Sequence, residues 1–248
     1  MSDYNFWAER YNTQACWTEP IRQYILQQIK LPKNGNVLEV GCGSQAVLKE
    51  FTSLGHKTVG IDIDYSILKY SKSNQLLSEL INANGYTLPF KDNYFDLSFC
   101  HYLLLWGENP IKFLKEMTRV TKKSGWVSCF AEPDYLSRID SPQELERLAI
   151  IQNKSLQNQG VNLSAGRNLL DWFAKIQLGN INWGIIGSQN TPSSQVEQDL
   201  EWNTLLKDIE GSITKEEIEA FRIIDQQSRN NGTRILFVPT FYAYAQKL

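Results

Sequence analysis

Apolar and polar positions follow two different periods along the first half of the chain. Five short apolar runs are typical of buried strands: residues 36–40, 57–61, 80–83, 95–100 and 126–131. Between them lie stretches with helical spacing: residues 45–54, 65–73 and 110–120. Strands separated by helices of this length predict a parallel sheet with right-handed crossovers.

The second half of the chain carries longer helical stretches and fewer strands. The helical stretches are residues 142–159, 165–176, 196–209 and 214–230, and the strands are residues 181–186 and 235–245. Thr214 and Glu217 have the spacing of a capping box. We expect insertions at residues 133–180 and 190–232 to form a helical cap over the sheet edge where ligands bind.

The front segment also has a helical pattern. Residues 2–29 read as two helical pieces, in which Thr18 caps the second piece and Pro20 begins it. We expect residues 1–30 to form a helical lid, and residues 1–248 to form a single domain.

Composition narrows the class of protein. Of 248 residues, 42% are hydrophobic and 21% are charged, which suits a packed domain. The net charge of −2, without a basic stripe, argues against a nucleic-acid partner. Since no apolar run is as long as a membrane span and no signal segment is recognisable, we expect a cytoplasmic protein without a membrane partner. The oligomeric state stays open.

Cysteine and histidine positions do not suggest a metal centre. The cysteines are Cys16, Cys42, Cys100 and Cys129, and none of them are paired at the spacing of a metal site. Only two histidines could add imidazole ligands. We therefore expect no bound metal and a reducing compartment.

A glycine-containing turn follows the first strand. Residues 37–46 read VLEVGCGSQA, so a buried strand enters Gly41 and Gly43 and then a helix. Glycines let the backbone bend sharply and approach a ligand closely, and a helix N-terminus offers free N–H groups. This pattern alone is a general nucleotide-binding turn, and with Ala46 it also fits the looser dinucleotide pattern.

Glu39 favours one ligand class over another. It lies inside a strand that we expect to be buried on both faces, where an unpaired carboxylate is costly. An ammonium group at the strand end would compensate it. NAD carries a pyrophosphate there instead, whereas S-adenosyl-L-methionine (SAM) carries an α-ammonium. The alternative is that Glu39 pairs with a lysine or points outward.

Asp62 ends the second strand, 19 residues after Gly43. A carboxylate at this position can accept hydrogen bonds from both ribose hydroxyls, a role common to NAD and SAM sites. The alternative is a turn residue or a helix cap, although Asp64 fits the cap better.

The order of several motifs resembles the class I SAM-dependent methyltransferases. These motifs are VLEVGCG, VGIDID, LPFKDNYFDLSFC and FLKEMTRVTKKSGWV, which together span about residues 35–132. The resemblance implies a Rossmann-like, doubly wound α/β fold with a seven-stranded, mostly parallel sheet and an antiparallel last strand. It also implies SAM as the cofactor and methyl transfer to an acceptor as the reaction.

The same resemblance implies cofactor-binding roles at the strand ends: Tyr11, Glu39, Gly41, Cys42, Gly43, Asp62, Ile63, Asn84, Gly85, Tyr86 and Cys100. Glu39 and the glycines would hold the methionine part, Asp62 the ribose, and Ile63 would pack beside the adenine. Tyr11 resembles a residue that closes over the cofactor. Two positions depart from the pattern, since relatives often have glycine where this chain has Gln45 and an acid where it has Asn84.

The acceptor site is less clearly indicated. His101 is the candidate general base, since neutral imidazole accepts a proton near pH 7, but it could equally be a packed residue at a strand end. Candidate acceptor-binding residues are the aromatic and basic ones of the predicted lid and cap: Trp7, Trp106, Tyr135, Arg138 and Arg167. Their alternative roles are core packing for the aromatics and solvated surface charge for the arginines.

Three functional hypotheses remain open from the sequence. The first is methyl transfer from SAM to a small-molecule acceptor in an aromatic-lined pocket, with a peptide acceptor as a variant. The second is an NAD-dependent oxidoreductase, and the third is a non-catalytic SAM-binding protein.

Overall fold

The computed structural model describes residues 3–72, 78–176, 178–187 and 194–248. Its main sheet has seven strands in the order β3-β2-β1-β4-β5-β9-β7. The strands are β1 (Asn36–Val40), β2 (Lys57–Asp62), β3 (Glu79–Asn82), β4 (Phe95–Cys100), β5 (Thr121–Pro133), β7 (Leu178–Ile186) and β9 (Thr240–Lys247). All pairs among β1 to β5 are parallel, and β9 runs antiparallel to both β5 and β7. The predicted seven-stranded, mostly parallel sheet with an antiparallel last strand is confirmed.

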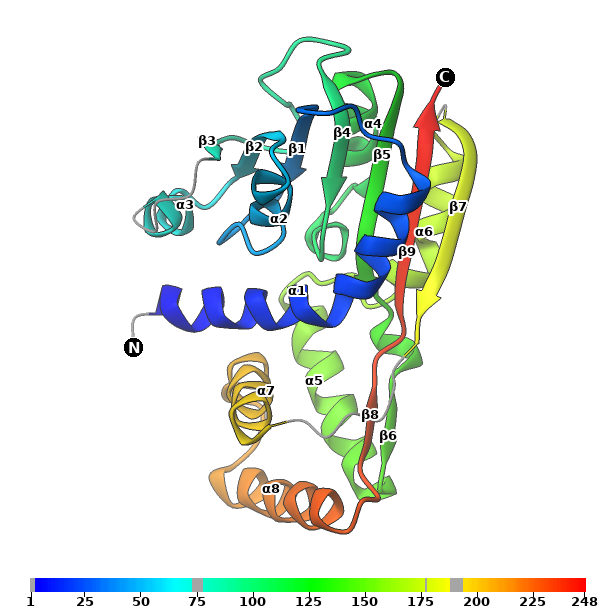
Figure 1. Cartoon of the computed structure of the whole chain (residues 1–248). Coiled ribbons are helices and arrows are strands. Elements are labelled where there is room, and N and C mark those ends of the chain that lie inside the picture. Colours follow the sequence, from blue (N-terminus) through cyan, green and yellow to red (C-terminus); the bar gives the residue numbers. More distant parts are fainter. Residues whose placement is uncertain (1–2, 73–77, 177, 188–193) are drawn as a thin grey trace.

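Helices cover both faces of the sheet (Figure 1). They are α1 (Asp3–Gln28), α2 (Leu48–Ser53), α3 (Tyr65–Lys72), α4 (Pro110–Val120), α5 (Glu146–Asn158), α6 (Ala165–Ala174), α7 (Gln195–Asp208) and α8 (Lys215–Asn230). Short 3-10 turns are η1 (Leu104–Trp106), η2 (Tyr135–Ser137) and η3 (Gln143–Leu145), and a small second sheet pairs β6 (Ile139–Ser141) with β8 (Ile235–Phe237).

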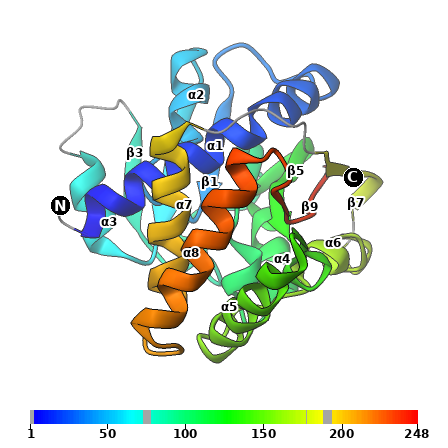
Figure 2. The same cartoon turned by 90° about the horizontal axis from the view of Figure 1, so that it is seen from below.

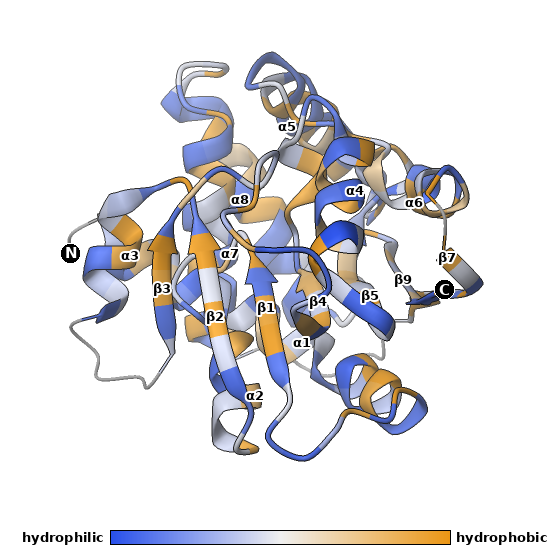
Figure 3. Ribbon diagram, turned by 90° about the horizontal axis from the view of Figure 1, so that it is seen from above, coloured by the Kyte–Doolittle hydropathy of each residue, from blue (hydrophilic) through white to orange (hydrophobic). Residues whose placement is uncertain are grey.

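Two apolar cores lie on opposite faces of the sheet. Leu38 and Val40 of β1 point into the core that α4 and α6 cover, whereas Val37 of β1 points into the core of α1, α2 and α3. Successive strand residues face opposite sides, so a strand between two helical layers must be apolar on both. Figure 3 shows this as apolar colouring along β1 and its neighbours.

The front helix differs from its prediction. α1 is one helix that contains Pro20, so the prediction that Thr18 caps a second piece is wrong. The Thr18 hydroxyl lies within hydrogen-bond distance of the backbone oxygens of Gln14 and Ala15, one turn earlier in the same helix. Figure 1 shows α1 running along the lower edge of the sheet and then turning upward. We attribute the turn to Pro20, because proline removes one helical hydrogen bond and crowds the preceding turn.

Two further element boundaries differ. The single strand predicted at 235–245 is wrong, because Pro239 lacks an N–H and the chain breaks there into β8 and β9, which belong to different sheets. The helix predicted from residue 45 begins only at Leu48, since Gln45 has a positive φ of 65°. The end of another predicted helix, Ser73, and residues 1–2, 177 and 190–193 of the predicted lid and cap lie outside the described residues.

α5, α7 and α8 lie beyond the carboxyl edge of β1, β4 and β5, with the first part of α1 between them and the sheet (Figure 1). Figure 2, which looks from that side, shows α1, α7 and α8 in front of the strands. The capping box predicted at Thr214 and Glu217 is confirmed at the start of α8. Ser194 and Glu197 form a second capping box at the start of α7.

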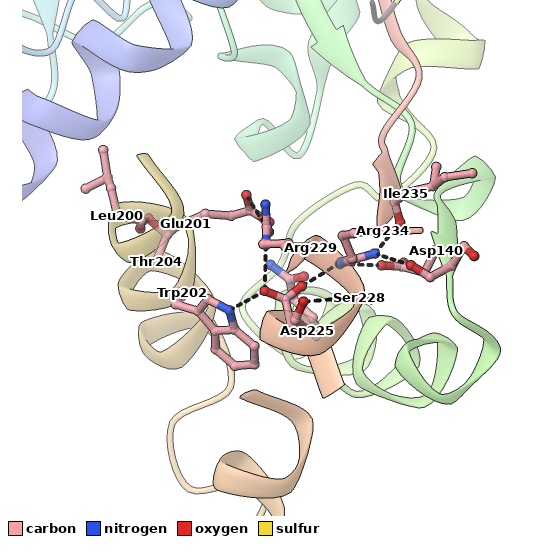
Figure 4. Close-up of polar contacts among 12 residues, drawn as sticks. Asp140, Leu200, Glu201, Trp202, Thr204, Asp225, Ser228, Arg229, Arg234 and Ile235 are labelled. Carbon is pink, nitrogen blue, oxygen red and sulfur yellow. Dashed lines mark hydrogen bonds and ion pairs between the residues drawn. The ribbon is translucent and has the colours of Figure 1, made fainter. Parts of the chain in front are cut away.

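A buried ion network joins α7, α8 and the small sheet (Figure 4). Asp225 of α8 accepts hydrogen bonds from the Trp202 indole (2.8 Å), Arg229 (2.7 Å) and Arg234 (2.6 Å). Arg234 also pairs with Asp140 of β6 at 3.0 Å, and both side chains are nearly inaccessible. The network therefore links α7, α8 and the small sheet, which lie far apart in the sequence.

We expect Asp225→Asn to destabilise the protein by about 3 kcal/mol, because it leaves two buried guanidinium groups with one counter-ion fewer. In a domain of this size that lowers the melting temperature by roughly 6–12 °C, which calorimetry measures. Asp171→Asn is the matched control, since its ion pair with Lys175 is exposed and we expect a loss below about 1 kcal/mol. An equal effect of the two substitutions contradicts the assignment.

The same network predicts a dependence on pH. Burial alone would raise the pKa of Asp225, but hydrogen bonds from Arg229, Trp202 and Arg234 outweigh it and hold the pKa below its ordinary value. A carboxylate with a lowered pKa stabilises the fold above its unfolded pKa and loses this contribution as pH falls. The stability difference between the parent and Asp225→Asn should therefore shrink below about pH 4.

Candidate active site

The turn after β1 is held by Asp62. Gly41 and Gly43 have positive φ values of 75° and 47°, which glycine adopts without strain. The Gly43 amide donates a hydrogen bond to Asp62 Oδ2 at 2.8 Å, and the Asp64 amide donates to Asp62 Oδ1 at 2.9 Å. One carboxylate therefore fixes the ends of β1 and β2 against each other. Each carboxylate oxygen has two lone pairs, so the group can accept further hydrogen bonds.

Gln45 takes the backbone conformation that a glycine would take. Its φ of 65° lies in the left-handed region, and its side chain is buried with only 1% exposed. Within the described residues, Gln45 Oε1 and the neighbouring Ser44 Oγ are buried without a hydrogen-bond partner. The departure from the glycine pattern therefore changes the side chain at this turn while the backbone keeps the glycine-like path.

Glu39 is buried in the middle of the sheet at 3% exposure. Its Oε2 has no hydrogen-bond partner among the residues that the structure describes. Burial raises the pKa of Glu39 well above its ordinary value, and the Leu48 amide and the Arg22 charge oppose this only in part. Arg22 hydrogen bonds both Glu50 and Thr18. One oxygen of this buried acid thus lacks a donor.

α1 places Tyr11 over the turn. A Cβ on Gly43 would lie 3.1 Å from the Tyr11 ring, so the ring packs directly on this glycine. Trp7, one turn earlier, stacks on Tyr11 with ring centroids 6.1 Å apart. Burial, together with the charges of Asp62 and Asp64, raises the pKa of Tyr11 to about 12, so the hydroxyl stays protonated near neutral pH. The front helix therefore brings Trp7 and Tyr11 to the edge formed by β1 and β2.

The ends of β2 and β3 carry the residues expected beside an adenine. Ile63 is 72% exposed, an unusual position for an isoleucine next to a buried strand. The side-chain oxygen of Asn84, Oδ1, accepts a hydrogen bond from the Tyr86 backbone amide at 2.9 Å. Gly85 has no room for a side chain, because a Cβ would lie 2.6 Å from Phe113. The Tyr86 ring stacks on Phe113 at 4.0 Å, so it forms part of the wall behind this turn.

His101 lies under α1 at the end of β4. Its Nε2 is 2.8 Å from the Thr18 hydroxyl. Burial, followed by the charge of Arg22, lowers its pKa well below the ordinary value, so the ring is neutral at pH 7. Cys42 is buried at the first turn, 4% exposed, and Cys100 is fully buried at the end of β4. The structure thus brings Glu39, Asp62 and His101 to one edge of the sheet, on neighbouring strands.

Cys100 and Cys129 form a cluster that sequence spacing does not reveal. They face each other across β4 and β5, and with Glu132 they are the one group of described residues close enough to share a metal ion. Glu132, however, accepts hydrogen bonds from the amides of Leu103, Leu104 and Leu105 at 2.9, 2.7 and 3.1 Å. Burial still raises the pKa of Glu132 to about 7. Its role in the structure is to hold η1 against the end of β5.

The predicted acceptor-binding residues do not form one group. Tyr135 is half-buried near Arg10, whereas Trp106 is 54% exposed. Arg138 pairs with Asp140 at 2.6 Å, and Arg167 pairs with Asp134 at 2.5 Å. Both guanidinium groups thus hold carboxylates within the chain.

Sequence reasoning missed Arg10. Its Nε and Nη1 are buried without a hydrogen-bond partner in the described part of the chain. The guanidinium lies 4.7 Å from the centre of the Trp17 ring, and seven residues, or about two helical turns, separate the two. The seven-residue spacing of Arg10 and Trp17 is visible in the sequence and places both on one face of the helix. The burial of the two Arg10 nitrogens can be seen only in the fold.

Among the helices of the described residues, none is long and apolar enough to cross a membrane.

The chain is similar in sequence to known methyltransferases. Residues 38–129 match the family model described as a methyltransferase domain. An uncharacterised methyltransferase of Schizosaccharomyces pombe is 32% identical over 63% of this chain and 61% of its own length. A malonyl-[acyl-carrier protein] O-methyltransferase of Buchnera aphidicola is 31% identical over 42% of each chain. The chain thus spans less than two thirds of these relatives.

Solved structures share the fold at low identity. A SAM-dependent methyltransferase of Methanosarcina mazei has a TM-score of 0.57 and 15% identity, over 90% of this chain and 97% of that one. At this identity the likeness concerns the fold alone. The matched family model and the strand order lead to one conclusion: residues 38–129 carry a methyltransferase domain within a seven-stranded, mostly parallel sheet.

Proposed function

We propose that this protein transfers a methyl group from SAM to a small-molecule acceptor. The observation that carries the proposal is Glu39, a buried acid with an oxygen that lacks a donor, directly before the turn at Gly41 and Gly43. When bound, SAM supplies an activated methyl group on a positively charged sulfur, and loss of that methyl group leaves a neutral thioether.

The residues at the sheet edge fit this cofactor. Glu39 would accept a hydrogen bond from the α-ammonium, which compensates the buried carboxylate. Asp62 would accept hydrogen bonds from the ribose hydroxyls with the lone pairs that the turn leaves free. The exposed Ile63 would pack on the adenine, and burial of this side chain by a ligand is favourable. Tyr11 would cover the cofactor from α1.

The pyrophosphate of NAD fits the same edge poorly. A second anion would face the buried Glu39 and the Asp62 carboxylate, whose pKa burial already raises. The matched family model is also a methyltransferase domain. Both points speak against the oxidoreductase hypothesis. A non-catalytic SAM-binding protein is distinguished by assay, since it would bind SAM and transfer no methyl group.

His101 would take the proton of an acceptor that must lose one. Its ring is held neutral by burial and by Arg22, which is the form that accepts a proton. The first part of α1 would act as a lid, and α5, α7 and α8 would close the acceptor side and exclude water from the reacting groups. Trp7 and Tyr135 would line that space.

The Glu39 role predicts a selective loss of affinity. Glu39→Gln should weaken SAM binding about ten- to hundredfold, because a charge-assisted hydrogen bond is lost. Binding of methylthioadenosine, which lacks the amino-acid part, should stay the same within about twofold. Isothermal titration calorimetry measures both ligands.

Asp62→Asn is the companion variant, and we expect it to weaken SAM and methylthioadenosine alike because both carry the ribose. If Glu39→Gln weakens the two ligands equally, the ammonium assignment is wrong. Binding of NAD in place of SAM by the parent protein contradicts the proposed function itself.

The lowered pKa of His101 predicts that the rate of methyl transfer is independent of pH near neutrality. The neutral form is populated above the pKa, so the transfer rate should not change between about pH 6.5 and 8 and should fall only at lower pH. His101→Gln should lower the rate by roughly a hundredfold while SAM affinity persists.

The control for this variant is His56→Gln, since His56 lies at the opposite end of β2, just before Lys57. It should leave the rate unchanged. If His101→Gln transfers the methyl group as fast as the parent protein, His101 is not the general base and only packs under α1.

A further inference from the structure

The Arg10 guanidinium has two buried N–H donors, at Nε and Nη1. Its Nε and Nη1 are inaccessible, and no hydrogen bond or ion pair joins them to a residue in the described part of the chain. The guanidinium lies over the face of Trp17, 4.7 Å from the ring centre, and its charge also acts on Asp208. A stacked aromatic ring stabilises a guanidinium but satisfies none of its N–H donors.

The neighbouring carboxylates already have donors of their own. Glu132 accepts hydrogen bonds from three backbone amides of the turn after β4. Asp208 accepts one from Gln152 at 2.7 Å, and Arg138 is paired with Asp140. None of these acids accepts a hydrogen bond from Arg10 Nε or Nη1, so these two donors are left for a group outside the described part of the chain.

Two tyrosines lie close enough to Arg10 to feel its charge. Burial is the largest influence on Tyr102 and Tyr135 and raises the pKa of both, while Arg10 acts in the opposite direction. Both hydroxyls therefore remain protonated near neutral pH. Tyr102 also has a φ of 52°, a conformation that is strained for a tyrosine. Arg10, Tyr102 and Tyr135 thus place O–H and N–H groups in one neighbourhood.

This neighbourhood adjoins the cofactor turn. Tyr11, the next residue of α1, packs on Gly43. Figure 1 shows this part of α1 between the carboxyl edge of the sheet and the helices α5 and α7. A group bound to Arg10 would therefore lie on the cap side of the edge where the methyl group is supplied.

We propose that Arg10 binds a carboxylate group of the methyl acceptor, so that the acceptor is an organic acid. This inference rests on the proposed function, whose acceptor it specifies. A guanidinium matches the planar carboxylate with parallel N–H donors. One cation balances one negative charge, and the nearby Asp208 and Glu132 disfavour a phosphate dianion at this place.

The test uses a metabolite extract of the source organism, separated on an anion-exchange resin before any reaction. Each fraction is incubated with methyl-labelled SAM and the 248-residue chain, and label transfer is counted. We expect the parent protein to label the organic-acid fraction. Arg10→Gln should label it about ten- to hundredfold more slowly at limiting acceptor, and Arg10→Lys should recover part of the rate.

The matched control is Arg222→Gln, since Arg222 also lies over a tryptophan, Trp202, at 5.9 Å but on an exposed position of α8. It should label the acids as fast as the parent protein. SAM affinity, measured by calorimetry, should stay within about twofold for all variants, which separates acceptor binding from misfolding.

The outcomes separate the two proposals. Label in the neutral or basic fractions alone, or equal rates for Arg10→Gln and the parent protein, overturns the carboxylate inference and leaves methyl transfer intact. SAM binding without label in any fraction overturns methyl transfer, and the acceptor inference with it.

Discussion

The candidate site depends on one buried carboxylate that has an oxygen without a hydrogen-bond donor. Glu39 lies within β1, where strands on both sides and helices on both faces exclude water. An acid in such a place destabilises the unliganded protein unless a donor reaches it. The Arg22 guanidinium nearby hydrogen bonds Glu50 and Thr18. The buried carboxylate therefore costs folding free energy that a cationic ligand can offset. Such destabilising groups are typical of functional sites.

The polar side chains at the carboxyl edge of the sheet differ in how many of their hydrogen bonds are made within the chain. Asp62 fixes the glycine turn through the Gly43 amide, and Glu132 fixes the turn after β4 through three amides. These acids are structural first, and only their remaining lone pairs are open to a ligand. Arg10 is the opposite case, since its buried donors meet no acceptor in the described residues. An acid with an unsatisfied oxygen and a guanidinium with unsatisfied donors suit a cofactor and an acceptor of opposite charge.

Much of the fold can be predicted from the sequence, because in the first half of the chain the hydrophobic period agrees with the structure that forms. β1, β4 and α4 begin and end where the hydrophobic period predicts. Errors arose where one residue overrides the pattern: Pro239 divides a strand-like run between two sheets, Gln45 delays α2, and Pro20 bends α1 without ending it. The site was harder to predict. The sequence made Glu39 and Asp62 candidates by their places in the strands. The partners of Arg138 and Arg167, and the unpartnered donors of Arg10, depend on tertiary contacts that the sequence does not show.

The most direct test of the account is the proton balance of SAM binding, measured by calorimetry in buffers of different ionisation enthalpy. Burial raises the pKa of Glu39, so an arriving ammonium should drive a proton off this acid. Above the ordinary pKa of a glutamic acid, where the raised pKa keeps Glu39 protonated, the parent protein should release up to about one proton more per bound SAM than Glu39→Gln does. Equal proton exchange in the two proteins, with equal affinity, would show that this carboxylate does not meet the ligand.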